Sequence, residues 1–470
     1  MKKAMSLVLA SILLLSLLSG CGGGGKKTEV PEVDLPAINE IKLGEDYQDI
    51  TATVKVLTNR TDIVDTKYAE YAASFHELYP NITVEYEAVS DYEEALNLRL
   101  PNGDWGDICF IPTSVAKSDY ATYFSPLGDM NTLDEIYHFI SDKSYNGVTY
   151  GIANGGNADG IAYNKAVFEA AGYTSDQDKL DADPSLKPLP ASVDDFIQAL
   201  KDIKEKTDAI PLYTNFSDKW PMGAWDAYIC VAATGDPDFH NYTMVHKANP
   251  FSDPGDGTGP FNVYRILYEA VAQGLCEPDP MSSDWEASKG MINRGEIGCM
   301  VLGSWAVQQF KDAGDKPEDV AYMPFPITVT DDAGNRVTSA GGNYSYAINN
   351  KNSQDQQIAS MVYLKWLLEA SPIYKDEGCI AALKSEPLPD FLADFEGIEL
   401  VPNAAAPEGE EDFFDKVNLQ SEVGINNDDY PDCTIVEHAL LKDKTLAEIM
   451  DEWNEKWSAA QESLEIEVKF

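Results

Sequence analysis

Basic residues are scarce in this chain of 470 residues, which has 34 lysines and arginines against 79 aspartates and glutamates. The formal net charge is therefore −45. A nucleic-acid partner requires lysine and arginine to neutralise its phosphates, so the composition excludes that class of function. An anionic membrane surface would also repel a protein with this net charge. Because the acidic residues are spread along the chain, we interpret them as a feature that favours solubility.

Signatures of catalysis and of metal binding are lacking as well. None of the five histidines lies in an HExxH pattern, and there is neither a GxSxG elbow nor a P-loop. Carboxylates are so numerous that no glycosidase pair stands out. No cysteines form a CxxC pair or a zinc-ligand spacing, and their disulfide pairing stays open. Residues 253–259 lack the spacing of a calcium loop, so we predict a plain turn. We predict no catalytic residue, no cofactor and no metal site.

Long apolar stretches are confined to the start of the chain. Ala4 to Leu18 is apolar, follows Lys2 and Lys3, and is too short for a stable transmembrane anchor. It leads into Leu-Ser-Gly-Cys21 and four glycines, which resemble a bacterial lipobox. The resemblance implies a signal peptide over residues 1–20 and a lipid on Cys21, which would anchor the protein to the outer face of the cell membrane. Residues 21–49 would then form a flexible linker between the anchor and the folded part. An ordinary signal peptide with an incidental cysteine is the alternative.

The rest of the chain alternates between strand and helix patterns. Residues 50–57, 82–89 and 107–111 have the β-branched composition of strands, and a helical period covers residues 64–78 between the first two. Helix patterns at 192–206 and 285–294, with a buried strand at 297–302, continue the alternation. This order predicts an α/β fold with mainly parallel sheets flanked by helices.

Four segments together resemble the extracellular solute-binding proteins of ABC importers, of the carbohydrate-type class. They are residues 149–165, 289–305 with its Gly-Ser-Trp end, 339–348 with its Gly-Gly pair, and the acidic C-terminal helix with its tryptophans. The resemblance implies a two-lobed periplasmic-binding-protein-like fold of class II type with a hinge. It implies one lobe from 50–155 plus 341–393, and a second from 156–340 plus 394–470. It also implies a monomer that works with membrane permease subunits and an ATPase.

A sugar site needs aromatic platforms for the ring faces and planar polar groups for the hydroxyls. The chain has eight tryptophans and 24 tyrosines. Trp305 ends a buried strand, and the resemblance places its position in the cleft. Strand ends and crossing loops supply the other candidates, with core packing or an ordinary loop role as the alternative for each. The predicted ligand-binding residues are Thr58, Arg60, Thr113, Asn157, Asp159, Trp220, Trp225, Trp285, Trp305, Asn343 and Tyr344.

The sequence thus predicts capture of a sugar or oligosaccharide between two lobes, with no chemistry performed on it. Two other interpretations stay open. One is a surface lipoprotein that hydrolyses polysaccharide, which would need a fixed carboxylate pair in the cleft. The other is a binding protein for a solute that is not a sugar, such as a polyamine or peptide.

Overall fold

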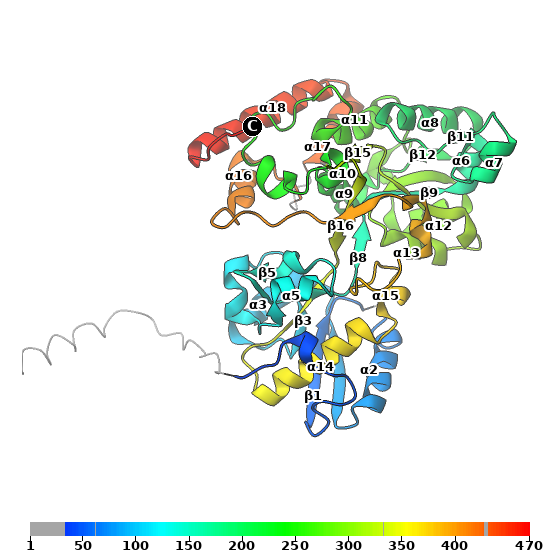
Figure 1. Ribbon diagram of the computed structural model, residues 1–470. Helices are drawn as coiled ribbons and strands as arrows, with labels where there is room; N and C mark the ends of the chain where they lie inside the picture. The colour runs from blue at the N-terminus through cyan, green and yellow to red at the C-terminus, as the bar shows by residue number, and fades with distance from the viewer. Residues whose placement is uncertain (1–32, 62, 332, 427–430) are drawn as a thin grey trace, which may run out of the picture.

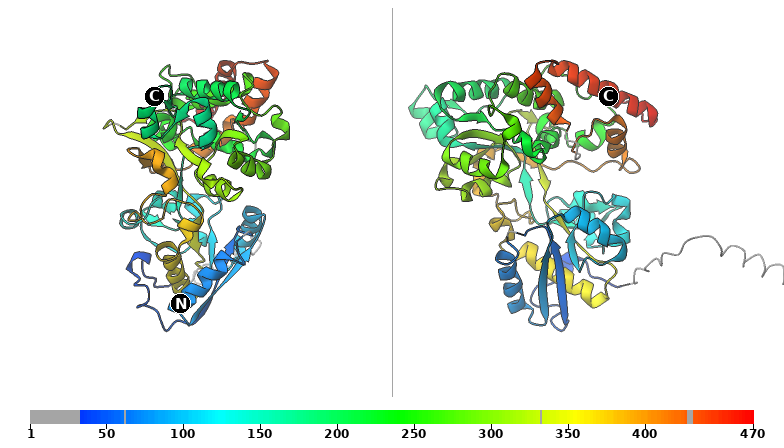
Figure 2. Two further views of the ribbon diagram at one scale, coloured as in Figure 1. Left: turned by 90° about the vertical axis from the view of Figure 1, so that its right-hand side faces the viewer. Right: turned by 180° about the vertical axis from the view of Figure 1, so that it is seen from behind.

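The computed structural model describes residues 33–470 except 62, 332 and 427–430. Two lobes lie one above the other and are joined by extended crossing segments (Figure 1). The two further views show the same separation into lobes from the side and from behind (Figure 2). The predicted signal peptide and Cys21 lie outside the described residues. Among the described residues, no helix is long and apolar enough to cross a membrane.

Lobe 1, the lower lobe of Figure 1, is built on a five-stranded sheet. Its strands in spatial order are β2 (Ile82–Ala88), β1 (Ala52–Thr58), β3 (Ile108–Phe110), β17 (Ser345–Ile348) and β7 (Ile152–Ala153). Helices α2 (Lys67–Leu78), α3 (Tyr92–Arg99) and α14 (Gln354–Glu369) cover this sheet. The buried face of α2 carries Tyr68, Tyr71 and Phe75, which recur at the helical period and join the apolar core.

Lobe 2 is built on a four-stranded sheet with the order β12 (Ile210–Leu212), β13 (Ile297–Val301), β9 (Gly160–Asn164) and β14 (Val320–Pro324). All residues of β9 and β13 are buried, as expected for central strands covered on both faces. The surrounding helices are α6 (Lys165–Ala171), α8 (Val193–Lys206), α9 (Gly223–Ala227), α11 (Gly259–Ala272), α12 (Trp285–Arg294), α13 (Ala306–Asp312), α16 (Phe413–Ser421), α17 (Asp432–Leu441) and α18 (Leu446–Ser463).

The prediction of mainly parallel sheets is confirmed, with one reversed strand in each lobe. In lobe 1, β1 runs parallel to β2 and β3, whereas β17 is antiparallel to both of its neighbours. In lobe 2, β12 and β13 are parallel, and β9 is antiparallel to β13 and β14. Both reversed strands follow directly after a segment that crosses between the lobes, so the reversal marks where the chain changes lobe.

Three extended segments lie together at the crossing. Strand β8 (Gly156–Ala158) pairs antiparallel with the end of β16 (Arg336–Gly342), and Gly156 forms a further antiparallel bridge with Ile380. The N–H of Gly156 donates to the carbonyl of Ile380 at 2.8 Å, and the N–H of Ile380 donates back at 2.8 Å. Strand β18 (Glu399–Val401) then pairs with β16 on the lobe 2 side. The resulting ribbon is held together by backbone hydrogen bonds, and it is joined to the two main sheets along the chain, where β8 leads to β9 and β16 leads to β17.

The predicted linker differs from the structure over residues 33–49. Ile38, the first residue of the short turn η1 (Ile38–Glu40), and Ile41, directly after it, are buried in the core of lobe 1. The N–H of Ile38 donates to the carbonyl of Leu127 at 2.8 Å. Two isoleucines are too few to form a helical or strand period, so the sequence gave no sign of this packing. Residues 21–32 of the predicted linker lie outside the described residues.

The six cysteines of the described ranges are all free and buried, so the open question of their pairing resolves as small apolar side chains in the core.

Replacing Gly156 with alanine should destabilise the crossing. A Cβ there would overlap the Phe139 ring and lie 2.8 Å from the carbonyl oxygen of Gly341. We expect a loss of about 1–3 kcal/mol in the free energy of unfolding, measured by urea denaturation, because overpacking of this kind costs that much. Gly341→Ala is the matched control, since a Cβ at that position meets no atom within 4 Å. Equal losses in the two variants would contradict the steric explanation.

Candidate functional site

Two adjoining hollows lie between the lobes beside the crossing segments. The smaller has a volume of about 350 Å³ and is lined by β8, α9, the loop after β13 and the end of β16. The larger, of about 1510 Å³, lies between residues 113–147 of lobe 1 and segments 240–241 and 405–426 of lobe 2. They meet at Gly342, which lines the smaller hollow and whose N–H donates at 3.3 Å to Asp142 in the wall of the larger.

Three of the predicted tryptophans form one cluster at the smaller hollow. The ring centroid of Trp220 lies 5.1 Å from that of Trp285 and 5.8 Å from that of Trp305, and Trp285 and Trp305 are 5.8 Å apart. Trp220 is 42% exposed and Trp305 half-buried, and both line the hollow, whereas Trp285 is buried behind them. Two indole faces supported by a third are the aromatic surface that a sugar ring requires.

Local structure explains how Trp305 reaches this position. It follows Gly303 and Ser304 at the end of β13 and precedes α13. A Cβ at Gly303 would lie 2.7 Å from the indole Nε1 of Trp305, so only glycine lets the ring fold back over the chain. Ser304 is buried, and its hydroxyl accepts the N–H of Ala158 at 3.1 Å and donates to Asn157 at 3.4 Å. The Gly-Ser-Trp pattern therefore ties the platform to the crossing strand.

Polar groups from the crossing segments share the hollow with the indoles. The side-chain amide of Asn157 donates to the side-chain oxygen of Asn343 across the paired strands β8 and β16. Asp159 follows β8, and one carboxylate oxygen accepts the hydroxyl of Ser339 and, at 3.8 Å, the thiol of Cys230. Burial raises the pKa of Asp159 to about 7, and these two hydrogen bonds only partly offset that effect. The carboxyl group can thus present a proton donor as well as an acceptor near neutral pH.

A second polar group, centred on Glu377, lies in lobe 1, and its members line neither of the two hollows. Arg60 forms an ion pair with this carboxylate at 3.1 Å, and the hydroxyl of Tyr68 donates to it at 3.1 Å. The side-chain amide of Asn154 donates to its other oxygen at 3.2 Å. Glu377 lies just after the short helix α15 (Ile373–Asp376), in a stretch of ordinary acidic residues. Nothing in its spacing distinguishes it, so only the fold reveals the connection to Arg60.

Asn343 and Tyr344 lie where β16 returns to lobe 1. The side-chain amide of Asn343 donates to the Sγ of Cys379 at 3.0 Å. Tyr344 is 52% exposed, and its ring centroid lies 4.9 Å from that of Phe110 in the core of lobe 1. Its carbonyl accepts the N–H of Asn154 at 3.2 Å, which fixes the backbone beneath it. An exposed tyrosine supported in this way offers a second aromatic face on the lobe opposite the tryptophans.

Of the predicted contacts, Asn157, Asp159, Trp220 and Trp305 line the smaller hollow and Thr113 lines the larger, whereas Thr58, Arg60, Trp225, Trp285, Asn343 and Tyr344 line neither. Trp225 is 1% exposed and packs edge-to-face on Phe325, so the structure places it in the core of lobe 2, away from the lining of the smaller hollow. Thr58 is fully buried, and its hydroxyl accepts the N–H of Arg60 at 3.2 Å, so it shapes the turn instead of facing a ligand. Thr113 is exposed and lines the larger hollow, apart from the tryptophan cluster.

The sequence analysis did not predict that small residues of α9 line the smaller hollow. Gly223, Ala224 and Ala227 line the smaller hollow, together with Tyr228, whose hydroxyl donates to the carbonyl of Gly160 at 3.0 Å. Their spacing along one short helix leaves room beside the indoles. Glycine and alanine carry no chemistry of their own, so the sequence gave them no weight.

Residues 253–259 form turns closed by their own side chains. One oxygen of Asp253 accepts the N–H of Gly255 at 2.9 Å, and one of Asp256 accepts the N–H of Thr258 at 3.0 Å. These are Asx turns, which explain the Asp-Gly composition without a bound ion.

The chain belongs to the family of bacterial extracellular solute-binding proteins, whose profile matches residues 59–372. This confirms the family and the two-lobed α/β fold that the sequence predicted.

Two solved structures are similar over nearly the whole chain. A binding protein of an ABC transporter from Bifidobacterium animalis subsp. lactis, in complex with mannobiose, is 43% identical with a TM-score of 0.81, covering 93% of this chain and 100% of that one. A manno-oligosaccharide-specific solute-binding protein from the same organism, in complex with mannotriose, is 42% identical with a TM-score of 0.81, covering 91% and 99%. An ABC transporter extracellular-binding protein of Pyrococcus horikoshii is 24% identical over 68% of this chain and 69% of its own.

The raised pKa of Asp159 predicts a pH-dependent stability. Relative to its ordinary value of 3.8, the native carboxyl keeps its proton up to about pH 7. Its contribution to stability is therefore fully present below about pH 4 and is lost as the pH rises through 7. Asp159→Asn, which stays neutral, should gain in melting temperature over the unsubstituted protein as the pH rises from 4 to 8.

The exposed Asp183 is the control for this series. Hydrogen bonds from Ser185 lower its pKa, so its contribution is already present above about pH 4 and is lost only at lower pH; the stability difference between Asp183→Asn and the unsubstituted protein should therefore stay nearly constant from about pH 5 to 8. A difference for Asp159→Asn that is constant from pH 4 to 8 would show that this carboxyl does not titrate in the native state over that range.

Proposed function

We propose that this chain captures a manno-oligosaccharide between its lobes for an ABC importer. The observation that carries the proposal is the smaller hollow, where the faces of Trp220 and Trp305 share one space with the planar polar groups of Asn157 and Asp159. A pyranose ring offers an apolar face and a rim of hydroxyls, which match these two kinds of surface. The two Bifidobacterium proteins, which hold mannobiose and mannotriose, support this choice of sugar.

The dimensions of the hollows suit a short oligosaccharide. A volume of about 350 Å³ is at the lower end of small-ligand sites. The larger hollow begins at Gly342 and gives room for further sugar units. Its walls carry Lys143, Asp142 and Lys117, which can hydrogen-bond to hydroxyls that project from the smaller hollow.

Capture proceeds by closure of one lobe on the other. The lobes, taken as 50–155 plus 341–393 and 156–340 plus 394–470, turn about the three crossing segments. The sugar stacks first on the indoles of lobe 2, and Arg60 and Tyr344 of lobe 1 then approach it. Expelling water from the closed cleft strengthens the hydrogen bonds that remain. The closed monomer delivers the sugar to the permease subunits of the importer.

Removing the indole of Trp305 should weaken sugar binding more than it weakens the fold. Trp305→Ala deletes a half-exposed stacking surface, so we expect affinity for mannotriose to fall at least about tenfold, equivalent to 1.4 kcal/mol, in isothermal titration. Trp225→Ala is the matched control, because this tryptophan is buried in the core. This variant should lose about 3–5 kcal/mol in its free energy of unfolding. The molecules that remain folded should keep their affinity for mannotriose.

If Trp305→Ala instead keeps its affinity and loses much stability, Trp305 packs in the core and does not contact the ligand. Analysis of the mannotriose after the titration distinguishes a binding protein from a hydrolase, since a binding protein returns the sugar intact. If mannotriose and mannobiose do not bind and a polyamine or peptide does, the result would favour a binding protein for a solute that is not a sugar.

We also propose that Cys21 carries a lipid that holds the protein at the outer face of the membrane. The proposal rests on the Leu-Ser-Gly-Cys pattern. Cys21→Ser should leave an unprocessed or soluble form that no longer partitions with the mature protein in the membrane fraction, as followed by fractionation and intact mass. Cys109→Ser, which changes a buried core thiol, is the control. Unchanged mass and partition of Cys21→Ser would contradict lipidation.

A further inference from the structure

The two walls of the larger hollow carry opposite charges. The lobe 1 wall holds Lys117 and Lys143 together with Asp142, so its net charge is positive. The lobe 2 wall, which we call the acidic wall, holds Glu408, Glu411, Asp412, Asp415 and Lys416. The segment before α16 lies over the part of lobe 1 that carries β5 (Ser144–Tyr145), as the front and rear views agree (Figures 1 and 2). The lysines and the acidic wall therefore face each other across the space between the lobes.

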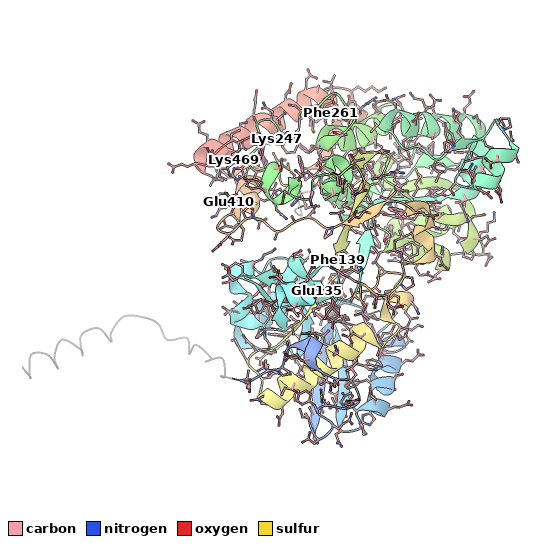
Figure 3. All side chains as sticks on the ribbon, in the orientation of Figure 1. Glu135, Phe139, Lys247, Phe261, Glu410 and Lys469 are labelled. Atoms are coloured by element: carbon pink, nitrogen blue, oxygen red, sulfur yellow. The ribbon has the colours of Figure 1, made fainter. Side chains whose placement is uncertain are left out.

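The acidic wall is fixed to the body of lobe 2. Glu410, which lies between wall residues, accepts from the Nε2 of His246 at 2.8 Å and forms an ion pair with Lys469 at 3.5 Å. Glu410 and Lys469 lie close together at this end of the upper lobe (Figure 3). Asp412 is paired with Lys416 at 2.6 Å. Among the described residues, the remaining carboxylates of this wall form no ion pair; they are Glu408, Glu411 and Asp415.

The two lysines of lobe 1 are similarly placed. Both are half-buried, and within the described part of the chain neither forms an ion pair. The Nζ of Lys143 lies 5.9 Å from the ring centroid of Tyr120. Burial lowers the pKa of Lys143; the carboxylate of Asp142 opposes this effect, and the charge of Lys117 adds to it. Two like charges on one wall are stabilised when an opposite charge approaches them.

One electrostatic interaction already crosses the hollow. Burial raises the pKa of Asp415, an effect that His240 opposes and Asp412 increases. The charge of Lys117, on the other lobe, lowers the pKa of the same carboxyl group. It does so with a hollow of about 1510 Å³ still between the lobes. Because Coulomb attraction grows as the distance shrinks, closure of the lobes would strengthen this interaction.

We propose that Lys117 and Lys143 attract the acidic wall and act as an electrostatic latch that favours the closed lobes. The inference rests on the closing motion of the proposed function and adds a source of free energy for it. With a net charge of −45, the two lobes repel each other in general, and the latch offsets that repulsion where the walls approach. A neutral sugar adds no charge of its own, so the latch acts through the protein alone.

A double-mutant cycle tests the latch. Lys117→Gln and Asp415→Asn should each lower the affinity for mannotriose about threefold at about 20 mM NaCl, in the range of exposed ion pairs, as measured by isothermal titration. The double variant should lose no more than either single variant, because both remove the same interaction. All three differences should disappear at about 500 mM NaCl, where screening acts over a few ångströms. Glutamine still donates a hydrogen bond to a sugar hydroxyl, so loss of such a contact does not produce this pattern.

Exchange of the two charges is the second test. Lys117→Glu should weaken binding more than Lys117→Gln does, and adding Asp415→Lys to it should restore most of the affinity. Lys42→Gln is the matched control, because Lys42 is an exposed lysine of lobe 1 that lines neither hollow. It changes the net charge equally and should leave the affinity unchanged. Additive losses in the cycle, losses that persist at high salt, or an equal loss in Lys42→Gln would overturn the latch.

A measurement without sugar separates the latch from the proposed function. Nitroxide labels at Asn131→Cys on α5 (Met130–Asp134) and Leu419→Cys on α16 report the distance between the lobes, in a Cys21→Ser background. Both positions are exposed, and the cysteines of the described residues are buried. At low salt, pulsed electron paramagnetic resonance should find longer distances in Lys117→Glu than in the labelled protein with Lys117. If mannotriose and mannobiose do not bind, the proposed function is wrong, whereas identical distance distributions would overturn the latch.

Discussion

The contact between the ring of Phe139 and Gly156 is the constraint on which the arrangement of the lobes depends. Phe139 has a left-handed backbone with φ of 61°, an uncommon conformation for an aromatic residue, and this turn directs its side chain into the crossing (Figure 3). The ring packs against Gly156 and the Cβ of Phe139 lies against Gly342, the residue of β16 that pairs with Gly156 of β8. Both positions need glycine because any side chain would occupy the space of the ring or of Asp142.

The same contact explains how two separate cores form one molecule. Phe139 and Ala153 of lobe 1 join an apolar cluster with Ala158, Ala340 and Ile380 from the three crossing segments. The larger cores of the two lobes stay apart. Most other members of this cluster belong to lobe 2, so rotation about the crossing would disturb only its few residues at the crossing and a few backbone hydrogen bonds, and it would leave both main cores intact. A hinge of this kind allows motion at low cost while the lobes remain rigid.

How much of this could be predicted from the sequence depends on whether the signal is local. The strands and helices follow from periodicity, and Trp305 follows from a Gly-Ser turn after a buried strand. Trp225 has a similar local setting to Trp220, five residues earlier, yet one lies in the core and the other lines the hollow. The difference is the rotation of α9 against Phe325, a contact between distant segments. Glu377 meets Arg60 for the same reason, across more than 300 residues, and no spacing rule could identify it.

The composition gives the number of acidic residues but does not show which of them the fold buries. Most of the 79 acidic residues can face water, where their charge costs little, but a few are held inside by the fold. Glu277 is 4% exposed and accepts the N–H and hydroxyl of Thr214, and Glu377 accepts from Arg60, Tyr68 and Asn154.

Asp159 has two weaker donors, Ser339 and Cys230, and its pKa rises to about 7. The donors that compensate for the loss of water therefore differ from one carboxylate to the next. Asp432 ends the series, because burial and the charge of Asp226 raise its pKa, and the N–H groups at the start of α17 only partly offset these effects. Burial without a paired charge favours the neutral form of such a carboxyl group, so the fold raises the pKa of Asp432 instead of providing it with a cation.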